Sequence, residues 1–446
     1  MMNRIASSIV ILSVILLVSS TSGCGRRPPS ADKSPVAEVA VADSGVRLSD
    51  VSHALSKDDW PAWRGSSQLG IASGQDLPTQ WDETTNIRWK ADVPGRGHGS
   101  PIIVGDAVFL ATAIESKSQQ RVLCYSKATG EVQWDEIVHS GGFPSANEVH
   151  KKGSNANSTL ASDGELLFAA FFNSGKIIAT ALDMTGQQVW QREVGSFGSK
   201  FGYAPSPILY QSFVIIAADN WGGGYLAALD AKTGEIAWRV ARGEISTYSS
   251  PMIANIGGRD QLIISGCGAV TSYDPANGQQ LWRTECIAEA TCGTAVTDGE
   301  SIFASGGYPD KETVCLSADG EKRWSNNTKV YEPSIIVDAD HVFAITDDGI
   351  AVCFDASSGE ALWRKRLGGN FSASPILASD RIYASNLSGE TFVFKAAADG
   401  YHSISTNQLG SDCYASPAVS DGQIFLRIGT GLGDQRHETL VCIANN

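Results

Sequence analysis

The chain consists of short runs in which apolar and polar residues alternate, and these runs come in sets of four. In the first complete set, SPIIVGDAVFLATA gives two runs joined by a Gly-Asp turn, RVLCYS gives a third and EVQWDEIV gives a fourth. Alternation with a period of two, interrupted by Asp-Gly, Thr-Gly and Asn-Gly turns, is typical of β-hairpins. The pattern therefore predicts a unit of four short antiparallel strands.

This unit repeats along the chain, and a tryptophan marks each copy. In six copies a Gly stands four residues before the Trp, and from Trp89 the tryptophans follow one another by 45, 56, 48, 44, 42 and 39 residues, with 41 more to Ile404 in ADGYHSI. A period of about 40 to 50 residues belongs to propeller blades. We expect Gly to allow a tight turn before the fourth strand, and Trp to pack between neighbouring sheets. The blade tryptophans are Trp89, Trp134, Trp190, Trp238, Trp282, Trp324 and Trp363.

The first strands of the units give the number of blades. Their starts recur at Pro101, Thr159, Pro207, Pro251, Thr294, Pro333, Pro375 and Pro417. The last unit supplies only three strands, whereas residues 86–93 (NIRWKADV) have a fourth-strand Trp with no third strand before it. The sequence thus predicts an all-β fold, an eight-bladed propeller of four-stranded antiparallel blades, whose last blade is closed by the N-terminal strand beside Thr439 to Ala444.

The composition agrees with one large β domain, and the net charge argues against nucleic acid as a partner. The chain has 446 residues, 42% of them hydrophobic, with 46 Gly. Its net charge of −14 argues against an extended nucleic-acid interface, because phosphate binding needs a basic face. Cys-x-x-Cys, Cys-x-x-Cys-His and zinc-ligand spacings are absent from the sequence, so no metal site is predicted.

The amino end indicates export. Arg4 precedes an apolar run over residues 5–18, and the segment TSGC ends at Cys24. A basic start followed by a short apolar run is typical of a signal peptide, and TSGC resembles a bacterial lipobox. We predict a lipoprotein signal peptide over residues 1–23, lipidation of Cys24, a disordered tether over residues 24–56 and the propeller over residues 57–446.

The other cysteines indicate little chemistry. Cys124, Cys315, Cys353 and Cys442 share the third-strand position in different blades and are predicted to be small buried apolar side chains. Cys267, Cys286, Cys292 and Cys413 lie nearer loops. Because an exported chain allows disulfides, Cys286 with Cys292 is the best candidate pair.

The phrase ALDAKTGEIAW, from Ala228 to Trp238, resembles the repeat of the PQQ-like eight-bladed β-propellers over roughly residues 86–446. The family includes quinoprotein dehydrogenases, which hold pyrroloquinoline quinone (PQQ) and calcium at the propeller axis, and BamB-like scaffold lipoproteins without a cofactor. The opening DWPAWRGSSQLGIASG also looks like exported PQQ-like propellers of planctomycete-type bacteria. The resemblance implies an adjacent Cys-Cys pair in alcohol-oxidising members, and no two cysteines are adjacent here.

A ligand site in a propeller is expected at the axial mouth, where the loops between blades converge. Aligned on the first-strand starts, these loops give a ring of candidate ligand- or partner-binding residues: Arg96, His98, Lys151, Asn155, Tyr203, Tyr248, Tyr331, Glu332, Phe371 and Tyr414. Such a ring can bind a partner or a small ligand, or it can plug the channel. The long loop from His139 to Ser158 contains His150, Lys151 and Lys152, a small basic spot on an acidic protein.

These features together predict a non-enzymatic, lipid-anchored binding scaffold of the bacterial cell envelope, a monomer on the periplasmic face of the outer membrane. Its partner would be an envelope protein or a small ligand at the axial face, and no cofactor or catalytic residue is expected. Two alternatives stay open. One is a PQQ-dependent alcohol or sugar dehydrogenase with calcium, and the other is a carbohydrate-binding propeller whose aromatic mouth stacks on sugar rings.

Overall fold

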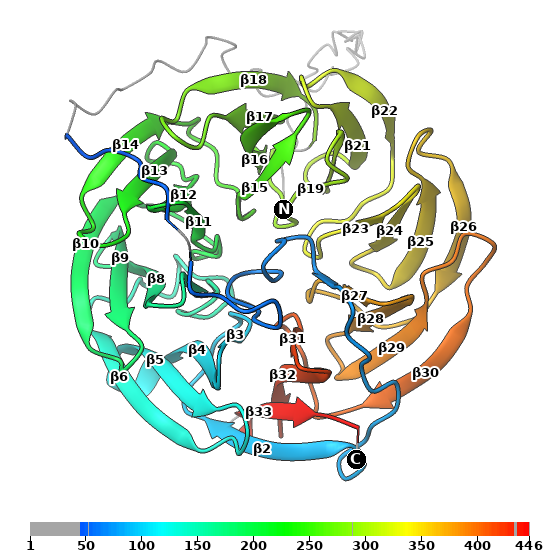
Figure 1. Cartoon of the computed structure of the whole chain (residues 1–446), viewed down its shortest axis with the longest axis horizontal. Coiled ribbons are helices and arrows are strands. Elements are labelled where there is room, and N and C mark those ends of the chain that lie inside the picture. Colours follow the sequence, from blue (N-terminus) through cyan, green and yellow to red (C-terminus); the bar gives the residue numbers. More distant parts are fainter. Residues whose placement is uncertain (1–44, 52, 288, 432–434, 446) are drawn as a thin grey trace, which may run out of the picture. The chain divides into compact units, whose positions relative to one another are not determined.

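The structure is a computed structural model that describes residues 45–51, 53–287, 289–431 and 435–445. Eight β-sheets form a ring, each running from a short first strand at the axis to a long fourth strand at the rim (Figure 1). The predicted fold, an all-β eight-bladed propeller of four-stranded antiparallel blades, is confirmed. Signal peptide residues 1–23, Cys24 and most of the predicted tether lie outside the described residues.

The first four blades follow one another along the chain. Blade 1 contains β3 (Ile102–Val104), β4 (Ala107–Ile114), β5 (Gln119–Ser126) and β6 (Val132–Ser140), with the short helix η1 (Glu115–Lys117) between β4 and β5. Blade 2 contains β7 (Ala161–Ser162), β8 (Leu166–Asn173), β9 (Lys176–Asp183) and β10 (Gln188–Ser196). Blade 3 contains β11 (Ile208–Tyr210), β12 (Phe213–Ala218), β13 (Tyr225–Asp230) and β14 (Ile236–Ala241). Blade 4 contains β15 (Met252–Ile256), β16 (Arg259–Gly266), β17 (Ala269–Tyr273) and β18 (Gln280–Glu285).

The other four blades complete the ring. Blade 5 contains β19 (Val296–Thr297), β20 (Ser301–Gly306), β21 (Glu312–Ser317) and β22 (Lys322–Asn326). Blade 6 contains β23 (Ile336–Asp338), β24 (His341–Ile345), β25 (Ile350–Asp355) and β26 (Ala361–Arg366). Blade 7 contains β27 (Ile376–Ala378), β28 (Arg381–Ser385), β29 (Glu390–Lys395) and β30 (Ser403–Gln408). Blade 8 contains β31 (Ala418–Ser420), β32 (Gln423–Thr430) and β33 (His437–Ile443), and its fourth strand is β2 (Ile87–Val93).

Closure of the ring by the N-terminal strand is also confirmed. Strand β2 pairs antiparallel with β33, so that Trp89 lies opposite Cys442 and Val93 opposite Glu438. Figure 1 shows β2 outside β33 at the rim of blade 8. Since the last blade receives its outer strand from the other end of the sequence, its sheet is completed without a partner chain.

Each blade tryptophan joins its blade to the next one. The indole Nε1 donates a hydrogen bond to a backbone carbonyl in the turn of the following blade, as Trp238 does to Pro275 at 3.2 Å. A β-carbon added to Gly278 in that same turn would lie 2.7 Å from the Trp238 ring, and its φ of +76° suits glycine. The Gly of one repeat therefore leaves room for the Trp of the repeat before it.

A β-bulge turns these tryptophans toward the next blade. In every blade the pairing of third and fourth strands shifts beside the Trp position, as between Ala228 and Leu229. Bulges re-aim the side chains next to them. In blade 7 this position belongs to Ser405, which pairs with Val393, rather than to Ile404 as the repeat spacing suggested.

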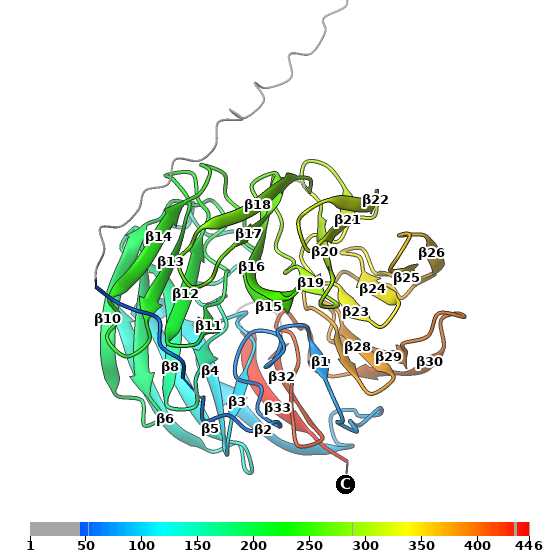
Figure 2. The same cartoon turned by 45° about the horizontal axis from the view of Figure 1, so that its top comes forward.

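An N-terminal segment, residues 45–51 and 53–85, lies over one face of the ring (Figures 1 and 2). It runs along the turns between first and second strands, where Asp59 accepts a hydrogen bond from Gly105 N at 2.8 Å. Strand β1 (Ile71–Ala72) pairs parallel with β27 and adds a fifth strand to blade 7. The described end of the predicted tether, residues 45–51 and 53–56, also contacts the ring, since Ser49 N donates to Ser212 Oγ at 3.0 Å and Ala54 N donates to Asp163 O at 3.1 Å.

The eight described cysteines are free thiols, so the candidate Cys286–Cys292 disulfide is wrong. Cys286 packs in a core between blades 4 and 5, where its Sγ lies 3.3 Å from Thr284 O and burial raises its pKa to about 11. Cys292 instead lines a cavity at the axis. The third-strand cysteines Cys124, Cys315, Cys353 and Cys442 are buried, as predicted.

Candidate functional site: an axial cavity at the mouth of the propeller

A ring of hydroxyl groups surrounds the axis. A Ser or Thr stands at or beside each first-strand start, and in seven blades its Oγ accepts a hydrogen bond, of 2.8 to 3.0 Å, from the backbone N–H of the equivalent residue one blade earlier. The eighth hydroxyl, Thr294, accepts from Trp63. The ring consists of Ser100, Thr159, Ser206, Ser250, Thr294, Ser334, Ser374 and Ser416. The seven bonds connect neighbouring loops around the channel and satisfy their backbone N–H groups.

Above this ring lies a cavity of about 330 Å³, which we call the mouth cavity. One position of the repeat builds much of its wall, namely the second residue before each ring hydroxyl. These eight residues all line the cavity: His98, Asn157, Ala204, Tyr248, Cys292, Glu332, Ser372 and Tyr414. A volume of a few hundred cubic ångströms is the size of a small-molecule site.

Trp63 of the N-terminal segment lines the mouth cavity although it belongs to no blade. Its Nε1 donates to Thr294 Oγ1 at 2.9 Å, at the level of the hydroxyl ring. The next residue, Arg64, donates to Leu69 O and Ile335 O at 2.5 and 2.8 Å and so holds the segment against blade 6. The indole therefore forms the floor of the cavity, opposite the mouth loops.

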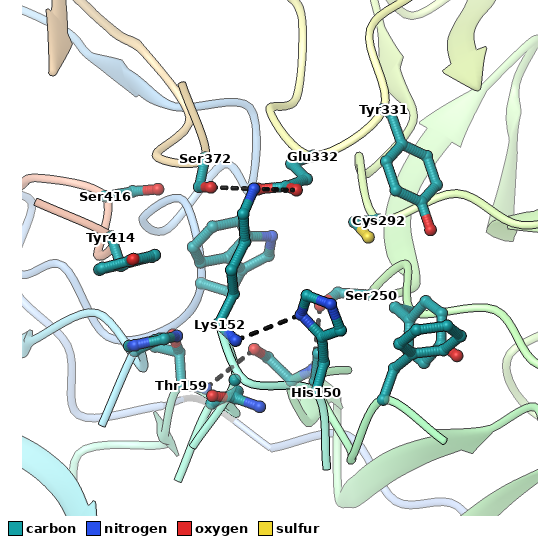
Figure 3. A pocket seen from close by; sticks show the side chains of 18 residues that line it. His150, Lys152, Thr159, Ser250, Cys292, Tyr331, Glu332, Ser372, Tyr414 and Ser416 are labelled. Atoms are coloured by element: carbon teal, nitrogen blue, oxygen red, sulfur yellow. Dashed lines mark hydrogen bonds and ion pairs between the residues drawn. The ribbon is translucent and has the colours of Figure 1, made fainter. Parts of the chain in front are cut away.

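Aromatic and charged side chains complete the wall. Tyr414 stacks on His98, with ring centroids 4.2 Å apart and planes 3° apart. Tyr331 lies on the other side of the cavity from Tyr414 (Figure 3). Glu332 accepts a hydrogen bond from Ser372, and its carboxylate is 3.6 Å from Lys152 Nζ.

The loop carrying Tyr331 and Glu332 is held by a half-buried carboxylate. Asp347 accepts hydrogen bonds from the backbone N–H of Tyr331 at 3.0 Å and of Glu332 at 2.8 Å. Burial raises the pKa of Asp347, although these two N–H groups oppose the shift. Asp347 therefore positions two wall residues without lining the cavity itself.

His98 is held in its neutral form. Burial lowers the pKa of His98 well below its ordinary value, and the charges of Arg96, Arg427 and Arg436 lower it further. Its Nε2 is buried and has no hydrogen-bonding partner among the described residues. The imidazole thus offers one uncharged nitrogen that can donate or accept, according to its tautomer.

The structure places the predicted mouth residues in two groups. His98, Tyr248, Tyr331, Glu332 and Tyr414 line the mouth cavity, together with His150 and Lys152 of the long loop. The remaining predicted residues do not line it: Arg96, Lys151, Asn155, Tyr203 and Phe371.

Register accounts for Tyr203 and Phe371, which stand three residues before their ring hydroxyls and are buried in the sheets. Tyr203 Oη donates to Ala217 O at 3.1 Å, and Phe371 packs beside Phe392. Extended backbone alternates its side chains with a period of two, so the second residue before the hydroxyl faces the axis in every blade. Tyr331 holds the same third position before Ser334 but lines the cavity, so this blade departs from the rule.

Trp63, Cys292, Phe201 and the hydroxyl ring are parts of the site that were not predicted from the sequence. The ring had a visible signal, because Ser precedes Pro at five of the eight first-strand starts used to count the blades and Ser334 follows another, Pro333. Trp63 had none, since it lies in the part of the chain without repeats.

His139, at the end of β6, predicts a pH dependence of stability. It is 9% exposed, its buried Nε2 has no partner among the described residues, and burial lowers its pKa to about 4. The unfolded chain binds the proton more strongly, with a pKa of about 6.5, so stability falls as pH drops from 6.5 toward 4. At pH 5 the loss should be about 2 kcal/mol.

The measurement compares wild type and His139→Leu by urea unfolding at pH 7.5 and pH 5. Because other groups titrate equally in both proteins, the variant should lose about 2 kcal/mol less than wild type between the two pH values. Equal losses in the two proteins would show that His139 does not carry this dependence.

The residues of the mouth cavity do not fit PQQ with calcium. Calcium takes six to eight oxygen ligands, several of them carboxylate oxygens. Glu332 is the one carboxylate lining the cavity, and it is already engaged by Ser372 and Lys152. Within the described ranges, no three His, Cys, Asp or Glu side chains are grouped to hold a metal ion. Cys292 is the one thiol among the described residues that line the cavity.

Fold and site together define a PQQ-like eight-bladed propeller with an open axial cavity. The family model described as "Outer membrane protein assembly factor BamB" matches residues 35–200, 158–365 and 310–403, so the chain belongs to this family. A BamB of Burkholderia pseudomallei (strain K96243) is 28% identical over 188 residues, which are 40% of this chain and 45% of that protein. The match thus spans less than half the length of that relative.

Solved structures agree on the fold. The structure of quinohemoprotein alcohol dehydrogenase from Comamonas testosteroni matches 87% of this chain and 81% of its own, with a TM-score of 0.66 and 12% identity. BamB from Moraxella catarrhalis matches 79% of this chain and 98% of its own, with a TM-score of 0.57 and 15% identity. At these identities the likeness concerns the propeller fold, which enzymes and assembly factors share.

Among the described residues, no helix is long and apolar enough to cross a bilayer.

Proposed function

We propose that this protein is a non-enzymatic binding scaffold of the bacterial cell envelope, anchored through a lipid on Cys24. We further propose that it binds a protein that takes part in outer-membrane assembly, as the name of its relatives suggests. The partner would bind to the face of the ring that carries the mouth cavity, which we call the mouth face. The absence of a fitting donor set for calcium favours this function over a PQQ dehydrogenase.

The observation that carries the proposal is a set of exposed aromatic side chains on the mouth face. Phe201, Trp221 and Tyr308 are 46%, 45% and 65% exposed. They lie on loops at the same ends of the strands, since Gly198 N donates to Asn220 Oδ1 and Ala290 N donates to Tyr308 O. Aromatic residues are enriched in the centres of protein interfaces, because they bury a large area at a small entropic cost.

The experiment places a photo-crosslinking amino acid at Trp221 or Tyr308 of the full chain in its own bacterium. The matched controls are Val189 and Leu362, which are equally exposed but lie on the outer strands β10 and β26. We expect adducts with an outer-membrane assembly protein from the mouth positions and none from the controls. Adducts from the rim positions alone would place the partner at a blade edge and contradict the proposal.

A second measurement tests the enzymatic alternative. The full chain is titrated with calcium chloride and PQQ, and dye-linked oxidation of alcohols and sugars is followed. We expect neither a rise in melting temperature nor turnover. Turnover that depends on the quinone would overturn the scaffold proposal and assign chemistry to the mouth cavity.

A further inference from the structure

The mouth cavity offers hydrogen-bond donors that the protein itself does not use. Thr159, Ser206, Ser250 and Ser416 line the cavity, and each Oγ already accepts a backbone N–H. In the described part of the chain none of these four hydroxyls donates a hydrogen bond. Their hydrogens are free to turn toward a ligand, because a hydroxyl both accepts and donates.

One buried polar atom of the wall, Nε2 of His98, also lacks a partner within the described residues. A buried polar group without a hydrogen bond costs about 1 to 3 kcal/mol, so such an atom is expected to meet a ligand or ordered water. His98 belongs to the wall position two residues before the hydroxyl ring. Tyr248 holds the same position in its blade, and the hydroxyls of Ser199 and Ser246 interact with its phenol.

The charges of the cavity cancel one another. Lys152 and Glu332 form an ion pair at 3.6 Å, and His98 is neutral because burial lowers its pKa. An anionic ligand would find no unpaired cation in the wall, and a cationic ligand would compete with Lys152 for Glu332. A neutral ligand with several hydroxyl groups can accept from the Ser and Thr donors and donate to the Glu332 carboxylate.

Aromatic ring faces frame these polar groups. The indole of Trp63 forms the floor, and the rings of Tyr414, Tyr331 and Phe201 stand in the wall. Aromatic faces carry partial negative charge and attract the C–H groups of a sugar ring, whose hydroxyls point outward around its edge. The combination of flat apolar faces with donors around them suits a pyranose.

We infer that the mouth cavity is a binding site for a neutral saccharide of one or two pyranose units. The sugar ring stacks on Tyr414 or Trp63, its hydroxyls accept hydrogen bonds from the Ser and Thr ring, and it donates to Glu332. Phe201 belongs both to this wall and to the exposed aromatic set of the mouth face, whereas Trp221 and Tyr308 lie outside the cavity. The saccharide site can therefore be tested separately from the proposed protein partner through Trp221 and Tyr308.

The test is isothermal titration calorimetry of the full chain in detergent micelles with cellobiose, maltose and N,N′-diacetylchitobiose, and with glucuronic acid as a charged comparison. We expect at least one neutral disaccharide to bind with a Kd below about 1 mM and glucuronic acid to bind more weakly. Tyr414→Ala should weaken binding at least about tenfold, through the lost ring face. Tyr248→Phe, which removes one hydroxyl of the wall and keeps the ring, should weaken it about three- to tenfold without unfolding the protein.

Trp221→Ala is the matched control, because this aromatic residue lies on the mouth face outside the cavity. It should leave saccharide affinity unchanged while it reduces crosslinking to the protein partner. No binding of the three neutral disaccharides would overturn the inference, as would binding that persists in both tyrosine variants or tighter binding of glucuronic acid. Crosslinking tests the protein partner and calorimetry tests the saccharide site. Either proposal can therefore fail while the other is supported.

Discussion

Replacement of Glu438 by glutamine is expected to lower the free energy of unfolding by about 3 to 5 kcal/mol. Glu438 stands at the start of β33, and its side chain is 1% exposed. Its Oε2 lies 2.5 Å from the Nη2 of Arg427, whose side chain is 2% exposed. The neutral amide would leave the Arg427 charge buried without compensation, which costs far more than the loss of a surface ion pair.

The contacts of Glu438 indicate that the loss of stability would arise where the last blade closes the ring. The carboxylate also accepts from Gly97 N, at 3.2 and 3.3 Å, and from Arg436 Nη1 at 3.0 Å. Arg427 in turn donates to Ala111 O of blade 1 at 2.7 Å. One buried carboxylate thereby connects strands β32 and β33 of blade 8 with blade 1 and with the loop that follows β2.

Urea unfolding of Glu438→Gln and of Glu193→Gln tests this expectation. Glu193 pairs with Lys176 at 2.6 Å, but it is 63% exposed, so its loss should change stability by less than about 0.5 kcal/mol. The double variant Arg427→Met with Glu438→Leu should be less destabilised than Glu438→Gln, because it leaves no unpaired charge. A loss below about 1 kcal/mol in Glu438→Gln would show that the buried pair does not hold the closing blade.

The parts of the fold predicted from the sequence are those that the repeat encodes. Gly and Trp recur because each Trp needs a turn without a side chain to pack on, as Trp238 packs on Gly278. The count of first strands predicted eight blades, and the unpaired Trp89 strand predicted closure. Because the four-strand unit recurs eight times, it can be recognised even where one copy departs from the pattern, as blade 7 does with Ser405 in place of Trp.

The candidate site was predicted less completely, because it depends on register and on a segment outside the repeat. The loops that reach the axis were identified, but a shift of one residue decides whether a side chain such as Tyr203 faces the cavity or the core. Parallel pairing of β1 with β27 and the position of Trp63 arise from contacts between residues over 200 positions apart. Such long-range contacts leave no periodic pattern in the local sequence from which they could be predicted.

Replacement of Trp89 by alanine is expected to destabilise the protein by about 3 to 5 kcal/mol and to open the ring at blade 8. Trp89 is 8% exposed and packs beside Phe425, with ring centroids 5.9 Å apart. Its Nε1 donates to Lys127 O of blade 1 at 2.9 Å, and its ring lies in the space that a β-carbon on Gly130 would occupy. The side chain thus connects the N-terminal strand with blade 8 and with blade 1. The seam that chain connectivity does not close lies within blade 8, between β2 and β33, and the contact of Trp89 with Phe425 of β32 supports it.

Urea unfolding together with hydrogen exchange tests this prediction, because the two methods separate global from local loss. In Trp89→Ala, amides of β2 and β33 should exchange faster than those of β12 and β13, because an outer strand that has lost its packing opens locally before the rest of the protein unfolds. Trp89→Phe keeps the packed ring but loses the hydrogen bond, so a loss of about 1 to 2 kcal/mol is expected. Uniform exchange across all blades in Trp89→Ala would mean that the ring unfolds as one unit and that the seam is no weaker than the other blade contacts.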